Sequence, residues 1–164
     1  MKRHDLSDSI ITEIYGRQAD RVYRLSCSLL KNAQDAEDAV QETFMRMIHR
    51  GPSFENEDHE KAWLLKTCQR VCFTMLKRRK TDQDPLEEHY DLGTWDDQEE
   101  LEMFLALITL APKYRAVIYL YYYEGYSGKE IAKIMGRPPS TIRNYLTEAR
   151  RLLKKELGED IDET

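Results

Sequence analysis

The chain has 164 residues, of which 41% are hydrophobic and 34% are charged, and its formal net charge is −5. This length suits one domain or two small ones, and the absence of both a long apolar run and a signal-peptide pattern predicts a cytoplasmic protein without a membrane span. Three cysteines without metal-site spacing, and no phosphate loop, nucleophile elbow or zinc-protease signature, predict a protein that is not an enzyme and has no cofactor or metal.

Helical periodicity dominates the sequence and strand signals are almost absent, so we predict an all-α fold. In the first half we expect helices over residues 7–30, 32–49 and 60–79, with the polar segment 53–59 (SFENEDH) as a loop before the third. Their predicted inward faces are apolar: Ile11, Ile14, Val22, Leu25 and Leu29 on the first, Ala36, Val40, Phe44 and Met47 on the second, and Leu64, Cys68, Val71 and Met75 on the third.

The outer side of the second helix is polar and acidic and carries one methionine. It comprises Asp35, Asp38, Gln41, Glu42 and Met45. Such a face suits docking on a basic partner helix, although a solvated helix surface explains the same residues.

The third helix predicts a basic stripe bordered by aromatic rings. Lys66, Arg70, Thr74 and Lys77 lie within about 80° of one another at about 100° per residue, and Trp63 and Phe73 border them. Cations beside aromatic rings suit single-stranded DNA, because phosphates need charge and unstacked bases need a ring to stack on. A solvated basic face is the alternative. Cys68 and Cys72 on this helix favour buried small side chains over a metal or redox site.

Charge is segregated along the chain. Residues 81–102 contain ten acidic residues and no lysine or arginine, whereas residues 103–157 contain ten basic and four acidic residues. We therefore predict two small helical bundles, residues 1–80 and 98–157, joined by a flexible acidic linker at 81–97 and followed by an acidic tail at 158–164. Helices are expected at 98–110, 112–124, 128–135 and 140–157. Because the local field matters more than the net charge, an acidic chain can still bind nucleic acid.

Residues 127–151 (SGKEIAKIMGRPPSTIRNYLTEARR) have the pattern of a helix-turn-helix. Ser127 and Glu130 form a capping box at a helix start, and Gly136 stands where that helix needs a left-handed last residue. Pro138 and Pro139 prevent the helix from continuing, and we expect Ser140 to cap the next one.

The second helix of this motif predicts a DNA-reading face. Ile142, Leu146, Ala149 and Leu153 fall on the inward side, and the opposite side carries Ser140, Arg143, Asn144, Thr147, Arg151 and Lys154. Early residues of such a helix contact base edges and later basic ones contact phosphates. Arginine pairs with guanine and asparagine with adenine. A solvated face on an ordinary helical hairpin is the alternative.

Three motifs occur in order along the chain: DAEDAVQETF at 35–44, AWLLK before the basic part of the third helix, and EGYSGKEIA at 124–132. On this ordered set, the chain from about residue 15 to 157, apart from the linker, resembles the extracytoplasmic-function (ECF) group of bacterial sigma factors. The resemblance implies a non-enzymatic initiation subunit that binds core RNA polymerase and promoter DNA, and it implies an anti-sigma partner.

The resemblance also implies residue roles. The polymerase-docking face would match Asp35, Asp38, Gln41, Glu42 and Met45. The melted minus-ten element would meet Ser53 and Phe54 of segment 53–59 together with Trp63, Lys66, Arg70 and Lys77, and the family flips out a base there. The minus-thirty-five element would meet Ser140, Arg143, Asn144 and Thr147, with Arg150, Arg151 and Lys154 near the backbone.

At several positions the chain departs from the family pattern. Arg70 stands where many members have asparagine, and Tyr145 and Glu148 stand at commonly basic positions. The region that would capture a base is unusually acidic and repels phosphate through Glu55, Glu57, Asp58 and Glu60. The promoter sequence therefore does not carry over. Two other functions fit the residues: a sigma-like polymerase adaptor without promoter selectivity, and a stand-alone helix-turn-helix regulator that binds duplex DNA as a dimer.

Overall fold

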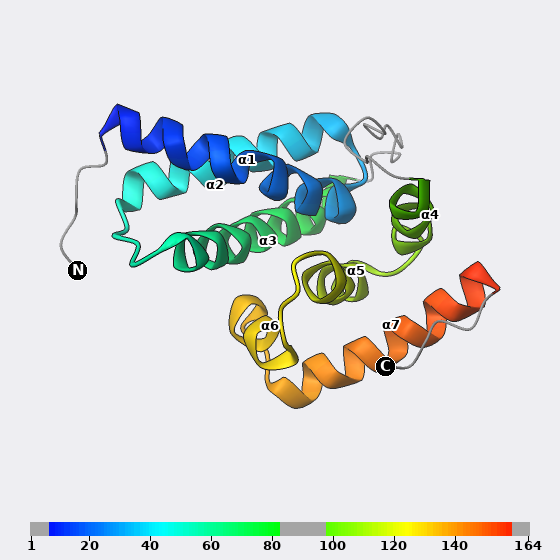
Figure 1. The fold of residues 1–164 in the computed structure, drawn as a ribbon. Helices are drawn as coiled ribbons and strands as arrows, with labels where there is room; N and C mark the ends of the chain where they lie inside the picture. The colour runs from blue at the N-terminus through cyan, green and yellow to red at the C-terminus, as the bar shows by residue number, and fades with distance from the viewer. Residues whose placement is uncertain (1–6, 83–97, 159–164) are drawn as a thin grey trace. The chain divides into compact units, whose positions relative to one another are not determined.

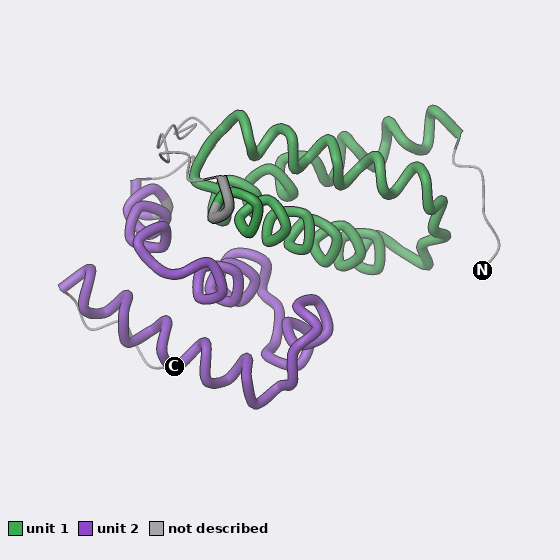
Figure 2. The backbone as a smooth tube through the Cα atoms, turned by 180° about the vertical axis from the view of Figure 1, so that it is seen from behind, with its two compact units in different colours: residues 1–90 green, residues 91–164 purple. Residues whose placement is uncertain are grey.

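The computed structural model describes residues 7–82 and 98–158, which form helices and connecting turns without a β-strand in these ranges (Figure 1). The chain divides into two compact units, residues 1–90 and 91–164 (Figure 2). The all-α prediction is confirmed. Most of the predicted linker and acidic tail, residues 83–97 and 159–164, lies outside the described residues.

The first unit contains α1 (Asp8–Leu30), α2 (Ala33–Arg50) and α3 (Glu57–Asp82), and each of these helices packs against the other two. Ser7 and Asn32 cap the first two helices with their side-chain oxygens, as the sequence predicts for residues of this kind. The connection between α1 and α2 is short, because Lys31 adopts the left-handed conformation that ends α1 and Asn32 then caps α2. Helix α2 ends in the same way at Gly51.

The core of this unit follows the predicted helix faces. Of the residues expected inside, Ile11 and Met75 are only half-buried, and the others are buried. Arg79 lies near the end of α3 and joins the other two helices: its guanidinium donates to the carbonyl of Leu30 (2.8 Å) and pairs with Asp35. A cation is thus placed at the C-terminus of α1, where helix carbonyls lack partners.

Helix α3 begins earlier and ends later than predicted. Its first residue is Glu57, inside the segment expected to be a loop, because the Asn56 side chain accepts a hydrogen bond from the His59 backbone N–H (2.8 Å) and so caps the helix. Its last residue is Asp82, so it includes the first two residues assigned to the linker.

The second unit contains α4 (Gln98–Leu107), α5 (Pro112–Ile118), the π-helical turn η2 (Tyr119–Tyr123), α6 (Gly128–Met135) and α7 (Pro139–Leu157). Helix α4 stops three residues short of the predicted end, and a turn follows whose Leu110 carbonyl accepts from the buried Arg115 (2.6 Å). The helix predicted at 112–124 changes to the wider π form, in which the rings of Tyr119 and Tyr123 stack at 5.2 Å.

The helix-turn-helix prediction is confirmed by the geometry of α6 and α7. Ser127 and Glu130 form both hydrogen bonds of the capping box, and Gly136 ends α6 with φ +64°. One detail was wrong: Ser140 does not cap α7. Pro138 occupies the cap position and Pro139 the first helical position, where a missing N–H costs nothing, so Ser140 lies within the first turn.

Candidate nucleic-acid interface

The recognition helix α7 has one buried and one exposed side. Ile142, Leu146, Ala149 and Leu153 are buried, as predicted, and α7 packs on α5 and α6. The side chains predicted to meet the minus-thirty-five element are exposed, except that Arg150 is half-buried: Ser140, Arg143, Asn144, Thr147, Arg151 and Lys154. Packing of these four apolar residues therefore fixes which face of the helix is exposed.

Two arginines of α7 already have partners within the unit. Arg150 donates from Nε to the Tyr122 hydroxyl (3.0 Å), and its guanidinium lies 5.1 Å from the ring centroid of Tyr121. Arg151 donates two hydrogen bonds to the carboxylate of Glu148 (2.6 and 3.1 Å). This pairing lowers the pKa of Glu148, chiefly through the hydrogen bond from Arg151. Arg143, by contrast, lies exposed near the start of the same helix.

A pair of tyrosines borders the other flank of α7. The rings of Tyr114 on α5 and Tyr145 on α7 meet edge to face at 5.8 Å, and the Lys113 ammonium lies 5.1 and 5.3 Å from their centroids. Cation–π contacts of this kind hold a lysine beside an aromatic surface. Tyr145 thus supports α5 from a position at which the family commonly has a basic residue.

In the first unit, segment 53–59 is folded onto the start of α3. The Phe54 ring lies 5.5 Å from the His59 ring and 5.9 Å from the Trp63 ring, both in edge-to-face geometry. The His59 Nδ1 accepts a hydrogen bond from the Glu55 backbone N–H (3.1 Å), which closes the turn. Three of the predicted minus-ten residues are brought together at this end of α3: Phe54 and Trp63 are half-buried, and Ser53 is exposed.

The basic stripe of α3 runs along the helix from this aromatic group. Lys66 is half-buried, whereas Arg70, Thr74 and Lys77 are exposed. Thr74 donates its hydroxyl to the Arg70 carbonyl (2.9 Å), so the helix satisfies that side chain locally. The stripe presents cations on one helix beside half-buried rings, which is the arrangement that single-stranded nucleic acid requires.

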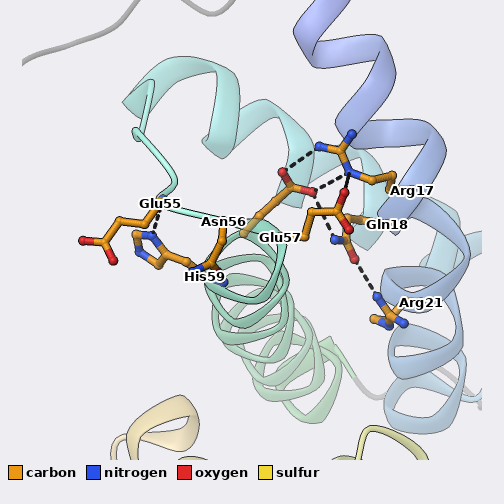
Figure 3. A network of polar contacts seen from close by, with 8 residues as sticks. Arg17, Gln18, Arg21, Glu55, Asn56, Glu57 and His59 are labelled. Carbon is orange, nitrogen blue, oxygen red and sulfur yellow. Dashed lines mark hydrogen bonds and ion pairs between the residues drawn. The ribbon is translucent and has the colours of Figure 1, made fainter.

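Polar contacts link the first turn of α3 to α1 (Figure 3). Glu60, with only 4% of its surface exposed, accepts from Arg17 Nε (3.2 Å) and Nη2 (2.9 Å) and from Gln18 Nε2 (3.0 Å). The carboxylate raises the pKa of Arg17, chiefly through this hydrogen bonding. The sequence prediction counted Glu60 among acids that repel DNA, but its charge is neutralised inside the protein. Forty-three residues separate it from Arg17, so no local spacing pointed to the pair.

The outer face of α2 carries the predicted docking residues. Asp38, Gln41, Glu42 and Met45 are exposed, whereas Asp35 is half-buried and pairs with Arg79. Ile48, which the prediction did not include, is 41% exposed one turn from the 42% exposed Met45. Its spacing was the available signal, because residues 41, 45 and 48 follow the helical repeat of four and three.

The burial predicted for Cys68 and Cys72 is confirmed. Cys27, Cys68 and Cys72 are buried, and the sulfurs of Cys68 and Cys72 lie 4.0 Å apart with Ser26 Oγ 3.1 Å from Cys68. Burial raises the pKa of Cys72. Across residues 7–82 and 98–158 there is no group of three or more side chains able to hold a metal ion, and no helix there is long and apolar enough to cross a membrane.

Two family models match the chain in the order of its units. Residues 14–81 match Sigma-70 region 2, and residues 101–153 match Sigma-70, region 4. The chain belongs to the ECF family of RNA polymerase sigma factors. Region 2 thus covers most of α1–α3, and region 4 covers α4 to α7, with the helix-turn-helix at its end.

Two relatives match more than nine-tenths of the chain. ECF sigma factor SigE of Mycolicibacterium smegmatis is 31% identical over 93% of this chain, which spans 63% of the length of that relative. RNA polymerase sigma factor SigV of Bacillus subtilis is 26% identical over 98% of both chains.

Solved structures agree with these matches. The sigma factor RpoE of Bartonella quintana, solved with the anti-sigma factor NepR, has a TM-score of 0.73 at 27% identity and covers 92% of this chain and 98% of its own. CnrH, at 20% identity and a TM-score of 0.68, shows the same fold. A stand-alone regulator and a non-selective adaptor are not favoured by these likenesses.

Proposed function

We propose that this chain binds core RNA polymerase and directs it to promoters, where it supports DNA melting and the start of transcription. The observation that carries this proposal is the presence, in one chain and in family order, of a region 2 unit with a basic, ring-bordered helix and a region 4 unit with an exposed recognition face. Its role is to bind and position, without catalysis of its own, and it acts where the polymerase is, in the cytoplasm.

Polymerase docking is assigned to the outer face of α2. Asp38, Gln41 and Glu42 supply polar and negative groups, and Met45 and Ile48 supply exposed apolar surface. Negative charge beside adaptable apolar side chains complements a basic helical partner. Asp35 contributes from the inner edge of this face, where its contact with Arg79 holds the start of α2.

The minus-ten element is assigned to segment 53–59 and α3. Phe54 and Trp63 offer ring surface to an unstacked base, and Lys66, Arg70 and Lys77 supply charge for the strand backbone. Stacking of one base on an aromatic ring is worth about 1–3 kcal/mol, which offsets much of the cost of opening a base pair.

The minus-thirty-five element is assigned to α7. Ser140, Arg143, Asn144 and Thr147 lie exposed on its first turns, where a recognition helix reads base edges in the major groove. Arg151 and Lys154 lie further along the helix, where they can contact phosphates. Arg150 would contact a phosphate while its guanidinium stays against the rings of Tyr121 and Tyr122. An anti-sigma protein is a further expected partner, since the similar RpoE was solved with one.

Run-off transcription tests the proposal directly. Core polymerase is mixed with this chain and a library of genomic fragments, and the transcript ends are mapped. We expect defined start sites that depend on both core and chain. Equal transcription from all fragments would favour an adaptor, and tight duplex binding by the chain without polymerase would favour a stand-alone regulator.

A further inference from the structure

The carboxylate of Glu60 is buried at the start of α3, one residue after the segment assigned to base capture. It accepts two hydrogen bonds from Arg17 and one from Gln18, both on α1, and Arg21 in turn donates to Gln18 Oε1 (2.9 Å). Glu57, 74% exposed, approaches the same guanidinium at 3.6 Å. A buried carboxylate with this many donors is held in one place.

From Glu60, a continuous series of contacts reaches Phe54. The Glu60 backbone N–H bonds to the Asn56 carbonyl (3.1 Å), and the Asn56 side chain accepts from the His59 N–H (2.8 Å). His59 then accepts from the Glu55 N–H and meets the Phe54 ring. These contacts join the buried carboxylate to the first turn of α3 and, through that turn, to segment 53–59. Figure 3 shows the polar contacts of Arg17 and Gln18 on α1 and of Glu55 and His59 at the start of α3.

The electrostatic field at the DNA does not explain why residue 60 is a glutamate. A negative strand approaching segment 53–59 already meets Glu55, Glu57 and Asp58, all exposed. Glu60 adds no field of that kind, because Arg17 neutralises it within a two-bond contact. What the pair supplies is geometry, and a binding site shaped before its ligand arrives loses less conformational entropy when it binds.

We propose that Glu60, together with Arg17 and Gln18, is a positioning group that shapes segment 53–59 for a single unstacked base of the minus-ten strand. It acts through the segment and does not touch DNA. The inference rests on the proposed function and adds to it the residues of α1 that control base capture.

The test uses holoenzyme assembled from core polymerase and the full chain, with fork-junction promoter DNA carrying one abasic site at a time along the minus-ten strand. For the natural chain, we expect one position at which loss of the base weakens binding by about tenfold, the scale of one stacked base. Glu60→Gln keeps the side-chain size and Arg17→Lys keeps the charge, but neither keeps the pair of hydrogen bonds between guanidinium and carboxylate. Each variant should reduce the loss to about threefold or less.

The control is Glu13→Gln, which removes a negative charge near Arg17 from an exposed position on α1. It should retain the full tenfold abasic effect. On DNA abasic at the sensitive position, the natural chain and all three variants should bind equally, because no base remains to be captured.

A uniform loss of binding by Glu60→Gln on intact and abasic DNA would overturn the inference, since it would show only a smaller folded fraction. If Glu60→Gln lacks a native circular dichroism spectrum, the exposed His59→Ala breaks the same series of contacts, and an unchanged abasic effect there would also overturn it. Failure of the natural chain to bind promoter DNA with core would instead remove the proposed function.

Discussion

The two surfaces proposed to bind nucleic acid, one in each unit, are built differently. In the first, the residues around segment 53–59 are fixed by contacts between α1 and α3 that join positions more than forty residues apart. In the second, a capping box, a left-handed glycine and a proline at the first helical position set the bounds of α6 and α7, and packing of α7 on α5 and α6 sets its exposed face. The first surface therefore depends on tertiary contacts between helices, whereas the second is one side of a regular helix.

This difference has a consequence for function. A pocket for one unstacked base must hold rings and turns at fixed positions, so small changes far from the DNA alter it. A recognition helix needs its axis and its exposed face fixed, and the side chains on that face then determine which bases are accepted. We therefore expect the first unit to control melting and the second to control sequence choice.

The largest expected effect concerns the α1–α3 contact. Glu60→Ala leaves the guanidinium of Arg17 and the amide of Gln18 without their shared acceptor, and we expect the free energy of unfolding of the first unit to fall by about 2–4 kcal/mol. Urea unfolding followed by hydrogen exchange in α1–α3 measures this. Glu57→Ala, at a 74% exposed side chain, should cost less than about 0.5 kcal/mol, and equal costs would contradict the assignment.

Arg143→Ala tests sequence choice in the second unit. If Arg143 pairs with guanine, the variant loses about 1–3 kcal/mol at a single base position of the minus-thirty-five element and tolerates other bases there. Holoenzyme selection from a randomised promoter library reads this out position by position. A loss spread evenly over all sequences would assign Arg143 to phosphate.

Ser127→Ala tests how much the capping box of α6 contributes to the stability of the second unit. The change removes one bond of the capping box, and we expect the second unit to lose about 1 kcal/mol of stability while the first is unaffected. Unit-resolved hydrogen exchange provides the measurement. Equal destabilisation of α1–α3 would show that the two units do not unfold separately.

The smallest expected effect is at Glu148. Glu148→Gln frees Arg151 from its two hydrogen bonds, so affinity for promoter DNA should rise modestly, and the plot of log affinity against log salt should steepen by about one phosphate contact. The pKa of Glu148 is lowered, so its pairing with Arg151 persists at neutral pH and is lost as pH falls through that lowered value. An unchanged slope of log affinity against log salt would show that Arg151 does not contact a phosphate.

Sequence reasoning succeeded where one stretch of chain carries the signal. The cap at Ser127, the left-handed Gly136 and the buried side of α7 are all local, and the structure has them as predicted. It failed at the same scale where two residue types compete, as when Pro138 and Pro139 displaced Ser140 from the cap of α7, and at the bounds of α3 and α4.

Contacts between distant residues were out of reach of that reasoning. Glu60 looked like one more acid in an acidic segment, and nothing within a helical turn marks Arg17 or Gln18 as its partners. Arg150 was predicted to lie near phosphate, and no local signal marked Tyr122, twenty-eight residues away, as its hydrogen-bond partner. Side-chain chemistry identified the candidate residues, but packing between helices decides which of them remain available to DNA.

The central claim is that both surfaces act on one promoter while the chain is bound to core polymerase. Permanganate footprinting of a selected promoter measures this most directly. We predict unpaired thymines around the minus-ten element only when core and chain are both present, with protection of the minus-thirty-five element from DNase I in the same complex. A footprint produced by the chain alone, or no strand opening with both present, would contradict the account.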